Sequence, residues 1–148
     1  MATIEYSISI ARSVSDVYSA ATAYDDPDAM KQWRSDIETI GITAGSPLRS
    51  GSMIAMTKHF NGSKIFINFD ILDLQRNKYV KLQGMHGRFP YTREIDFGVN
   101  GRETNVKDVI VVNTSWLFFW YAPLLSRALE AQIKREWETL KRQLEAQG

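Results

Sequence analysis

The chain has 148 residues, a length typical of one domain spanning residues 1–148, and a chain of this size can bury roughly 70% of its unfolded surface. It contains no cysteine, which excludes disulfides, thiolate zinc sites and cysteine nucleophiles, and its two histidines lie far apart in the sequence, so we expect no metal centre. The net charge of +1, without a basic stripe, argues against nucleic acid as a partner.

No stretch of the sequence is typical of a targeting or membrane-spanning segment. The first residues do not combine a charged region with an apolar run, so no secretory signal is predicted. The longest apolar stretch, residues 116–125, is too short to cross a bilayer. We therefore expect a soluble, cytoplasmic protein.

The N-terminal part of the sequence predicts one strand followed by two short helices. Residues 3–10 alternate between apolar and polar side chains, as a half-buried strand does. Ser13 is placed to cap a helix, which should end near Asp25 because proline disfavours helical geometry in the residue before it. Pro27 then suits the first turn of a second helix, which ends near Trp33.

Two Asn-Gly pairs, at residues 61–62 and 100–101, predict β-hairpins because each is flanked by alternating segments. A two-residue loop at the first pair predicts an apolar strand face with these partners: Ile54 opposite Phe69, and Met56 opposite Ile67. A two-residue loop at the second pair predicts these partners: Arg93 opposite Asp108, Ile95 opposite Val106, and Tyr91 opposite Ile110. A four-residue loop at 87–90 would place His86 beside Tyr91 and Gly84 beside Arg93, where the glycine would leave room for a large side chain or a ligand.

The C-terminal residues 123–147 predict one long helix, with Pro123 in its first turn. Apolar side chains recur along one face of it at helical spacing, at Leu125, Leu129, Ile133, Trp137, Leu140 and Leu144. The order is therefore strand, two short helices, six strands and a long helix. Consecutive hairpins of this kind indicate an α+β fold, with an antiparallel sheet of about seven strands whose apolar face is covered by helix.

This order resembles the SRPBCC group, also called START-like or Bet v 1-like, and within it the polyketide cyclase/dehydrase and lipid-transport family. The most specific piece is the segment 23–33, which contains Asp26-Pro27, ends at Trp33 and precedes a strand from Ile37; the helix start at Ser13 and the ending 140–145 support it. The resemblance covers nearly the whole chain. It implies a helix-grip fold, in which the sheet wraps around the long helix, with a cavity between them for a lipid, polyketide, aromatic or other apolar molecule.

Arg93 and Asp108 are the most informative charged residues, since the predicted register places both on the face that the resemblance assigns to the cavity. Charges are costly in apolar surroundings unless they are paired. In one interpretation Arg93 anchors a carboxylate or enolate of the ligand and Asp108 orients the guanidinium. In the other, the two form an ion pair that is purely structural.

Further candidate binding residues flank this pair. His86 and Tyr91 could contribute acid or base chemistry, or His86 could simply hydrogen-bond solvent or Tyr91 near the end of its strand. Trp33 is expected either to wall the mouth of the cavity or to pin the second helix to the sheet. The apolar lining is expected from strand and helix faces that carry Ile67, Phe69, Ile95, Ile110, Leu129 and Ile133.

Two other segments carry open alternatives. Residues 116–121, which include Trp116, Trp120 and Tyr121, are expected to form a gate, a lip for transient membrane contact or a dimer surface, or else to fold back onto the core. The chain is accordingly expected to be a monomer or a homodimer. Gln132 and Glu136 beside the apolar stripe are interpreted as a solvated flank rather than as cavity residues.

Three functional hypotheses follow. The first is a protein that binds a small, largely apolar molecule with an anionic or carbonyl end near Arg93. The second is a cofactor-free cyclase, aromatase or dehydratase in which Arg93 or Tyr91 stabilises an enolate. The third is a protein-interaction module that uses residues 116–121 and has a vestigial cavity. The sequence contains no Gly-x-Ser-x-Gly elbow, no glycine-rich phosphate loop and no His-x-x-x-His motif, so the catalytic residues of the second hypothesis stay unknown and no cofactor is predicted.

Overall fold

The computed structural model describes residues 1–147 and confirms the expected order of strands and helices. The elements in chain order are β1 (Ala2–Ile10), α1 (Val14–Ala21), α2 (Pro27–Trp33), β2 (Ile37–Ala44), β3 (Met53–Phe60), β4 (Ser63–Gln75), β5 (Tyr79–His86), β6 (Phe89–Asn100), β7 (Glu103–Val112), the 3-10 turn η1 (Trp116–Phe118) and α3 (Ala122–Gln147).

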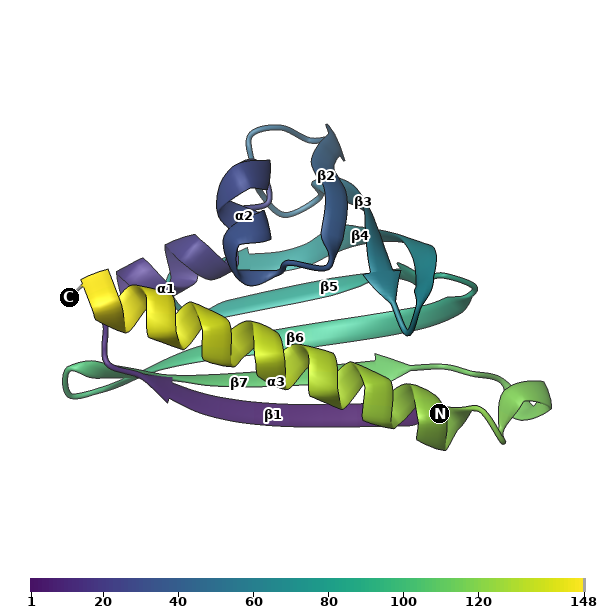
Figure 1. Ribbon diagram of the computed structural model, residues 1–148. Coiled ribbons are helices and arrows are strands. Elements are labelled where there is room, and N and C mark those ends of the chain that lie inside the picture. The colour runs from purple at the N-terminus through teal and green to yellow at the C-terminus, as the bar shows by residue number, and fades with distance from the viewer. Residues whose placement is uncertain (148) are drawn as a thin grey trace.

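The seven strands form one antiparallel sheet in the order β1-β7-β6-β5-β4-β3-β2. The two short helices join β1 at one edge of the sheet to β2 at the other. Figure 1 shows α3, coloured from green to yellow, lying across the sheet over β1, β7 and β6, with α1 and α2 gathered near its C-terminal end. This is the helix-grip arrangement, and it confirms the predicted fold class.

The helix starts are those that the sequence predicts. Ser13 is the N-cap of α1, and its Oγ accepts a hydrogen bond from the backbone N–H of Asp16 at 3.2 Å. Asp26 caps α2 in the same way, with its Oδ1 accepting from the N–H of Ala29 at 3.2 Å and Pro27 in the first turn. The Asp26 cap fixes where α2 begins. It thereby helps to place Arg34, the residue that follows α2, against the interior of the sheet.

The β3–β4 hairpin has the predicted register, with Ile54 opposite Phe69 and Met56 opposite Ile67. Asn61 and Gly62 both have positive φ angles, +51° and +81°, as a type I′ turn requires.

The other two hairpins lie two residues away from the predicted register. Their turns are Gly87-Arg88 and Gly101-Arg102, each beginning with a glycine at φ +63°, which is typical of a type II′ turn. The observed partners are these: Arg93 opposite Ile110 and Leu82, Asp108 opposite Ile95, Tyr91 opposite Val112 and Gly84, Val106 opposite Phe97, and His86 opposite Phe89. A shift of two residues keeps each side chain on its own face of the sheet, so the predicted faces hold although the pairs were wrong.

Gly84 has a different role from the one that the predicted register gave it. It lies opposite Tyr91 rather than Arg93, and a Cβ added to it would fall 1.8 Å from the carbonyl oxygen of Asn68 on β4. The glycine therefore permits a close approach between the backbones of β4 and β5, rather than leaving room for a ligand or for Arg93.

The core lies between the concave face of the sheet and α3. The predicted helix stripe is buried along its length, at Leu125, Leu129, Ile133, Trp137, Leu140 and Leu144. Trp33, on α2, is also buried and packs against Trp137, with ring centroids 5.2 Å apart. Trp33 thus packs α2 against α3, and it does not line the cavity described below.

Candidate ligand-binding site

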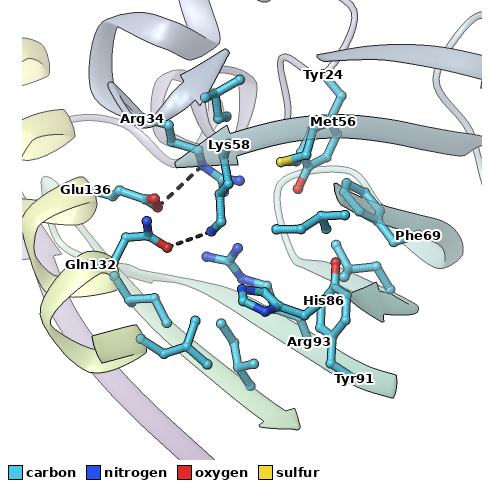
Figure 2. A pocket seen from close by; sticks show the side chains of 16 residues that line it. Tyr24, Arg34, Met56, Lys58, Phe69, His86, Tyr91, Arg93, Gln132 and Glu136 are labelled. Atoms are coloured by element: carbon cyan, nitrogen blue, oxygen red, sulfur yellow. Dashed lines mark hydrogen bonds and ion pairs between the residues drawn. The ribbon is translucent and has the colours of Figure 1, made fainter. Parts of the chain in front are cut away.

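A small polar cavity, called here the inner cavity, lies between the concave face of the sheet and α3 (Figure 2). Its volume is about 30 Å³, enough for a water molecule or two but not for a drug-sized ligand. The residues that line it are Tyr24, Arg34, Ile37, Met56, Lys58, Ile67, Phe69, Leu82, His86, Tyr91, Arg93, Ile110, Leu129, Gln132, Ile133 and Glu136.

A larger apolar hollow, called here the outer recess, lies between the hairpin ends and the start of α3, and its volume is about 370 Å³. It is lined by Phe60, Ile65, His86, Gly87, Arg88, Phe89, Phe118, Trp120, Tyr121 and Leu125. This volume falls in the range of small-molecule sites, and among the described residues that line it Arg88 is the one with a formally charged side chain. His86 belongs to both linings, so the outer recess and the inner cavity meet at this side chain.

Arg93 and Asp108 are paired, although they do not lie directly opposite one another on the strands. Arg93 Nε donates to Asp108 Oδ1 at 2.9 Å and Nη2 donates to Oδ2 at 2.5 Å, which makes the pair bidentate. Asp108 is buried and also accepts from Trp137 Nε1 at 2.9 Å. Burial alone would lower the pKa of Arg93, but the Asp108 carboxylate outweighs it and raises this pKa. These contacts favour the structural interpretation of the pair, because the guanidinium is already neutralised within the chain.

Lys58 is the cation of the inner cavity that has no carboxylate partner among the described residues. It lies on the same face of β3 as Met56 and is buried, and its Nζ donates to Gln132 Oε1 at 2.6 Å (Figure 2). Among residues 1–147, no carboxylate oxygen lies within 4 Å of this ammonium. Burial lowers the pKa of Lys58 to about 8, with Glu136 partly opposing the shift.

Arg34, the residue that ends α2, is the third cation of the inner cavity. It is buried, and its Nε lies 3.8 Å from Glu136 Oε2, too far for a hydrogen bond. The guanidinium also lies over the Trp33 ring, 4.4 Å from the centroid. Its Nε and Nη2 atoms have no hydrogen-bond partner among the described residues, so two donors remain available in the cavity wall.

Gln132 and Glu136 are cavity residues, and the interpretation of them as a solvated flank was wrong. Both are buried, at 4% and 6% exposure, because α3 lies deeper in the sheet than its apolar stripe alone suggests. Gln132 links two groups: it accepts from Lys58 and donates from Nε2 to Asp36 Oδ2 at 3.1 Å. The polar edge of the helix stripe therefore faces the sheet and provides partners for cations there.

One interpretation of the sequence predicts that His86 hydrogen-bonds solvent or Tyr91. In the structure the His86 side chain is buried instead. Its ring lies edge-on to those of Phe60 and Tyr91, with centroids at 5.0 and 6.2 Å, and its Nε2 has no partner among the described residues. Burial and the nearby Lys58 lower the pKa of His86 to about 3, so the ring is neutral at physiological pH. Burial raises the pKa of Tyr91, which keeps its hydroxyl protonated.

Most of the residues proposed from the sequence come together around the inner cavity. The eight that line it are His86, Tyr91, Arg93, Ile67, Phe69, Ile110, Leu129 and Ile133. Three do not reach it: Asp108 lies behind Arg93, Trp33 packs on α3, and Ile95 is buried in the core.

The polar residues that sequence reasoning missed are Tyr24, Arg34 and Lys58. Lys58 had a usable signal, because it is the one charged residue on the apolar face of its hairpin. Arg34 and Tyr24 carried no periodic signal, since each lies outside the regular elements.

The segment 116–121 forms one wall of the outer recess and is only partly packed. Phe118 and Tyr121 contact the ring of Phe89, at centroid distances of 5.5 and 5.9 Å. Trp116 and Phe119 are 79% and 74% exposed. The segment therefore does not fold back onto the core as a whole, while membrane contact and self-association through its exposed side chains stay predictions.

Among residues 1–147, no helix is long and apolar enough to span a membrane. Within the same range, no three histidine, aspartate or glutamate side chains gather closely enough to hold a metal ion.

No protein-family model matches the chain by sequence, and no curated protein sequence matches it. Solved structures do match over nearly its whole length. A START superfamily protein from Mycobacterium smegmatis matches with a TM-score of 0.78 at 12% identity over 99% of each chain. The Zhui aromatase/cyclase from Streptomyces sp. R1128 matches with a TM-score of 0.78 at 9% identity, over 97% of this chain and 93% of that one. Ara h 8.0201 matches with a TM-score of 0.68 at 12% identity, over 93% of this chain and 97% of that one. At these identities the matches show a shared fold alone.

Proposed function

We propose that this chain, which has the fold of the SRPBCC superfamily over its full length, binds a small, largely apolar molecule between its sheet and α3. The observation that carries the proposal is the junction of the two spaces at His86. There an apolar recess of about 370 Å³ and a cavity lined by several polar groups share one side chain as a wall. This combination of an apolar volume with a few convergent polar groups is typical of small-molecule sites.

In this proposal the outer recess removes the apolar body of the ligand from water. Burial of apolar surface contributes roughly 25 cal/mol per Å², so a ligand enclosed by Phe60, Ile65 and Leu125 is held mainly by its apolar area. The inner cavity then orients the molecule through one polar end. Because its volume is only about 30 Å³, it has room for a small head group and not for the body of the ligand.

The cyclase hypothesis is less well supported by the cavity groups on which it relied. Acid-base catalysis is most effective when the pKa of the group lies near the working pH. The pKa of His86, at about 3, is far below that range, whereas the raised pKa of Tyr91 only keeps its hydroxyl protonated as a hydrogen-bond donor. Arg93 is occupied by Asp108. Binding without turnover is therefore the function that the site supports best.

Native mass spectrometry of the freshly purified chain, compared with its denatured mass, tests the proposal. A discrete added mass of an apolar compound is the expected result. Nile red, a neutral apolar dye, then reports on the site: its fluorescence should rise with the protein and fall when decanol is added.

Matched variants on one strand control for non-specific binding of the dye. Ile65→Asn changes the wall of the outer recess and should reduce dye affinity by about tenfold or more. Leu72→Asn makes the same kind of change at an exposed position of the same strand outside that recess and should leave dye affinity unchanged. No co-purified compound, together with equal dye binding by all three proteins, would contradict the proposal.

A further inference from the structure

We propose that the ligand end that enters the inner cavity is a carboxylate, and that Lys58 and Arg34 bind it. This inference rests on the proposed function and specifies the chemical class of the ligand as an amphiphilic carboxylic acid. It moves the anchoring role from Arg93, where the sequence had placed it, to two cations that the sequence did not single out.

The charges of the cavity do not balance. Three cations line it, Arg34, Lys58 and Arg93, whereas two carboxylates lie beside them, Glu136 near Arg34 and Asp108 bonded to Arg93. A third carboxylate, Asp36, lies beyond Gln132 and is paired with Arg135. Lys58 remains, with the neutral amide of Gln132 as its hydrogen-bond acceptor. A buried cation is costly without a counter-charge, so an anionic group is the addition that this cavity favours most.

The available hydrogen bonds also favour an acceptor. The buried atoms without a hydrogen-bond partner among the described residues include Arg34 Nε, Arg34 Nη2 and the Tyr24 hydroxyl, and all three belong to residues that line the inner cavity. Water can take these positions in the free protein. A carboxylate has two oxygens that accept up to about four hydrogen bonds, so it can replace that water and supply the missing charge at once. A hydroxyl or ketone could satisfy a donor but would leave the charge of Lys58 uncompensated.

The sizes of the two spaces agree with this chemistry. A cavity of about 30 Å³ has room for two water-sized atoms, which suits the two oxygens of a carboxylate. The alkyl or aromatic body would remain in the outer recess and pass the neutral His86 ring at the junction. Figure 2 shows Lys58, Arg34 and Gln132 on one side of the cavity, with His86 and Tyr91 on the other.

Displacement of Nile red by decanoate and by decanol at pH 7 tests the inference, because the two compounds share an apolar chain and differ in the head group. The unaltered protein should bind decanoate more tightly than decanol by about tenfold or more. Lys58→Met should abolish this preference by weakening decanoate and not decanol, whereas Lys58→Arg should retain it. The matched control is Lys64→Met, which removes a lysine at an exposed position on β4 and should leave the preference intact.

Equal affinity for decanoate and decanol in the unaltered protein would overturn the carboxylate assignment while leaving the proposed function in place. The same conclusion would follow if Lys58→Met, folded by circular dichroism, kept the full preference for decanoate. If neither compound displaced the dye and the dye itself did not bind, the proposed function would fail together with the inference.

Discussion

The carboxylate of Asp108 joins the sheet to the long helix, because it accepts hydrogen bonds both from Arg93 on β6 and from the indole Nε1 of Trp137 on α3. The three side chains come from three different elements. Asp108 is 1% exposed, so the pair lies in the interior rather than at the surface. The loss of stability on mutating such a pair depends on whether one charge or both charges are removed.

Replacing Asp108 by leucine should destabilise the fold by about 3–5 kcal/mol, because the buried guanidinium of Arg93 would then lack a counter-charge. The double variant Arg93→Met/Asp108→Leu should recover most of this loss, since no unpaired charge remains. Urea unfolding of the unaltered protein and the two variants measures the difference. If the Asp108→Leu variant were as stable as the unaltered protein, this pair would not hold the sheet to α3.

Lys58→Met should stabilise the empty protein at pH 7, by about 1–3 kcal/mol, because it removes a buried cation that has no carboxylate partner. The folded-state pKa of Lys58, about 8, is below its ordinary value of 10.5. The unfolded chain therefore binds more protons between these two pH values, and the unaltered protein gains stability as pH rises through that window.

The free energies of unfolding of the two proteins should accordingly converge between about pH 8 and pH 10.5. Urea titrations at closely spaced pH values measure this convergence. A variant that is less stable than the unaltered protein, or a difference that is constant with pH, would contradict the assignment of Lys58 as an uncompensated charge.

Decanoate affinity should be nearly constant from pH 6 to 7.5 and should fall above about pH 8, by up to tenfold per pH unit, as Lys58 loses its proton in the free protein. Decanoate itself stays ionised over this range. The charged and titratable groups around Lys58 are Arg34, Asp36, His86, Tyr91, Arg93 and Glu136.

Decanol provides the control for this pH profile, since a neutral head group should show no such fall. Lys58→Met should give a flat profile for both compounds. If the affinity of the parent protein for decanoate stayed constant up to pH 10, the amine of Lys58 would not contact the head group.

Gly84→Ala should destabilise the fold by more than about 3 kcal/mol, because the new Cβ would meet the β4 backbone at Asn68. The matched control is Gly98→Ala, also within a strand, where the nearest atom to an added Cβ is 3.8 Å away. Gly98→Ala should therefore lower the stability of the fold only slightly. Similar thermal midpoints for the two variants would argue against the close approach of β4 and β5.

The faces of the strands could be predicted from the sequence, while the exact partners could not. The Asn61-Gly62 turn determined its register because both residues adopt positive φ. At Asn100 the asparagine stays in the strand and Gly101 begins the turn, a choice that alternation cannot decide, since a shift of two residues preserves every face. The ion pair of Arg93 with Asp108 survives this shift because the two long side chains meet diagonally.

The polar groups of the cavity were harder to predict than its apolar wall. Helical spacing predicts that Gln132 and Glu136 are solvated, because spacing alone does not show how deeply a helix lies in a curved sheet. Arg34 follows a short helix, and its inward direction depends on where α2 is capped and how it packs against α3. Such positions are set by tertiary packing, and a single sequence carries little trace of them.

The central claim is that one ligand occupies both the outer recess and the inner cavity. Methyl-selective NMR of the protein, titrated with decanoate at pH 7, tests it most directly because each space has its own methyl groups. The reporters are Ile65 and Leu125 for the outer recess, Ile110 and Leu129 for the inner cavity, and Ile42 and Leu74 as controls outside both linings.

We expect the resonances of both reporter pairs to shift along one saturable curve with a single dissociation constant, while the two control resonances stay in place. Shifts confined to Ile65 and Leu125 would place the ligand in the outer recess alone and contradict a head group at Lys58. No saturable shift at any of the four reporters would contradict binding between the sheet and α3.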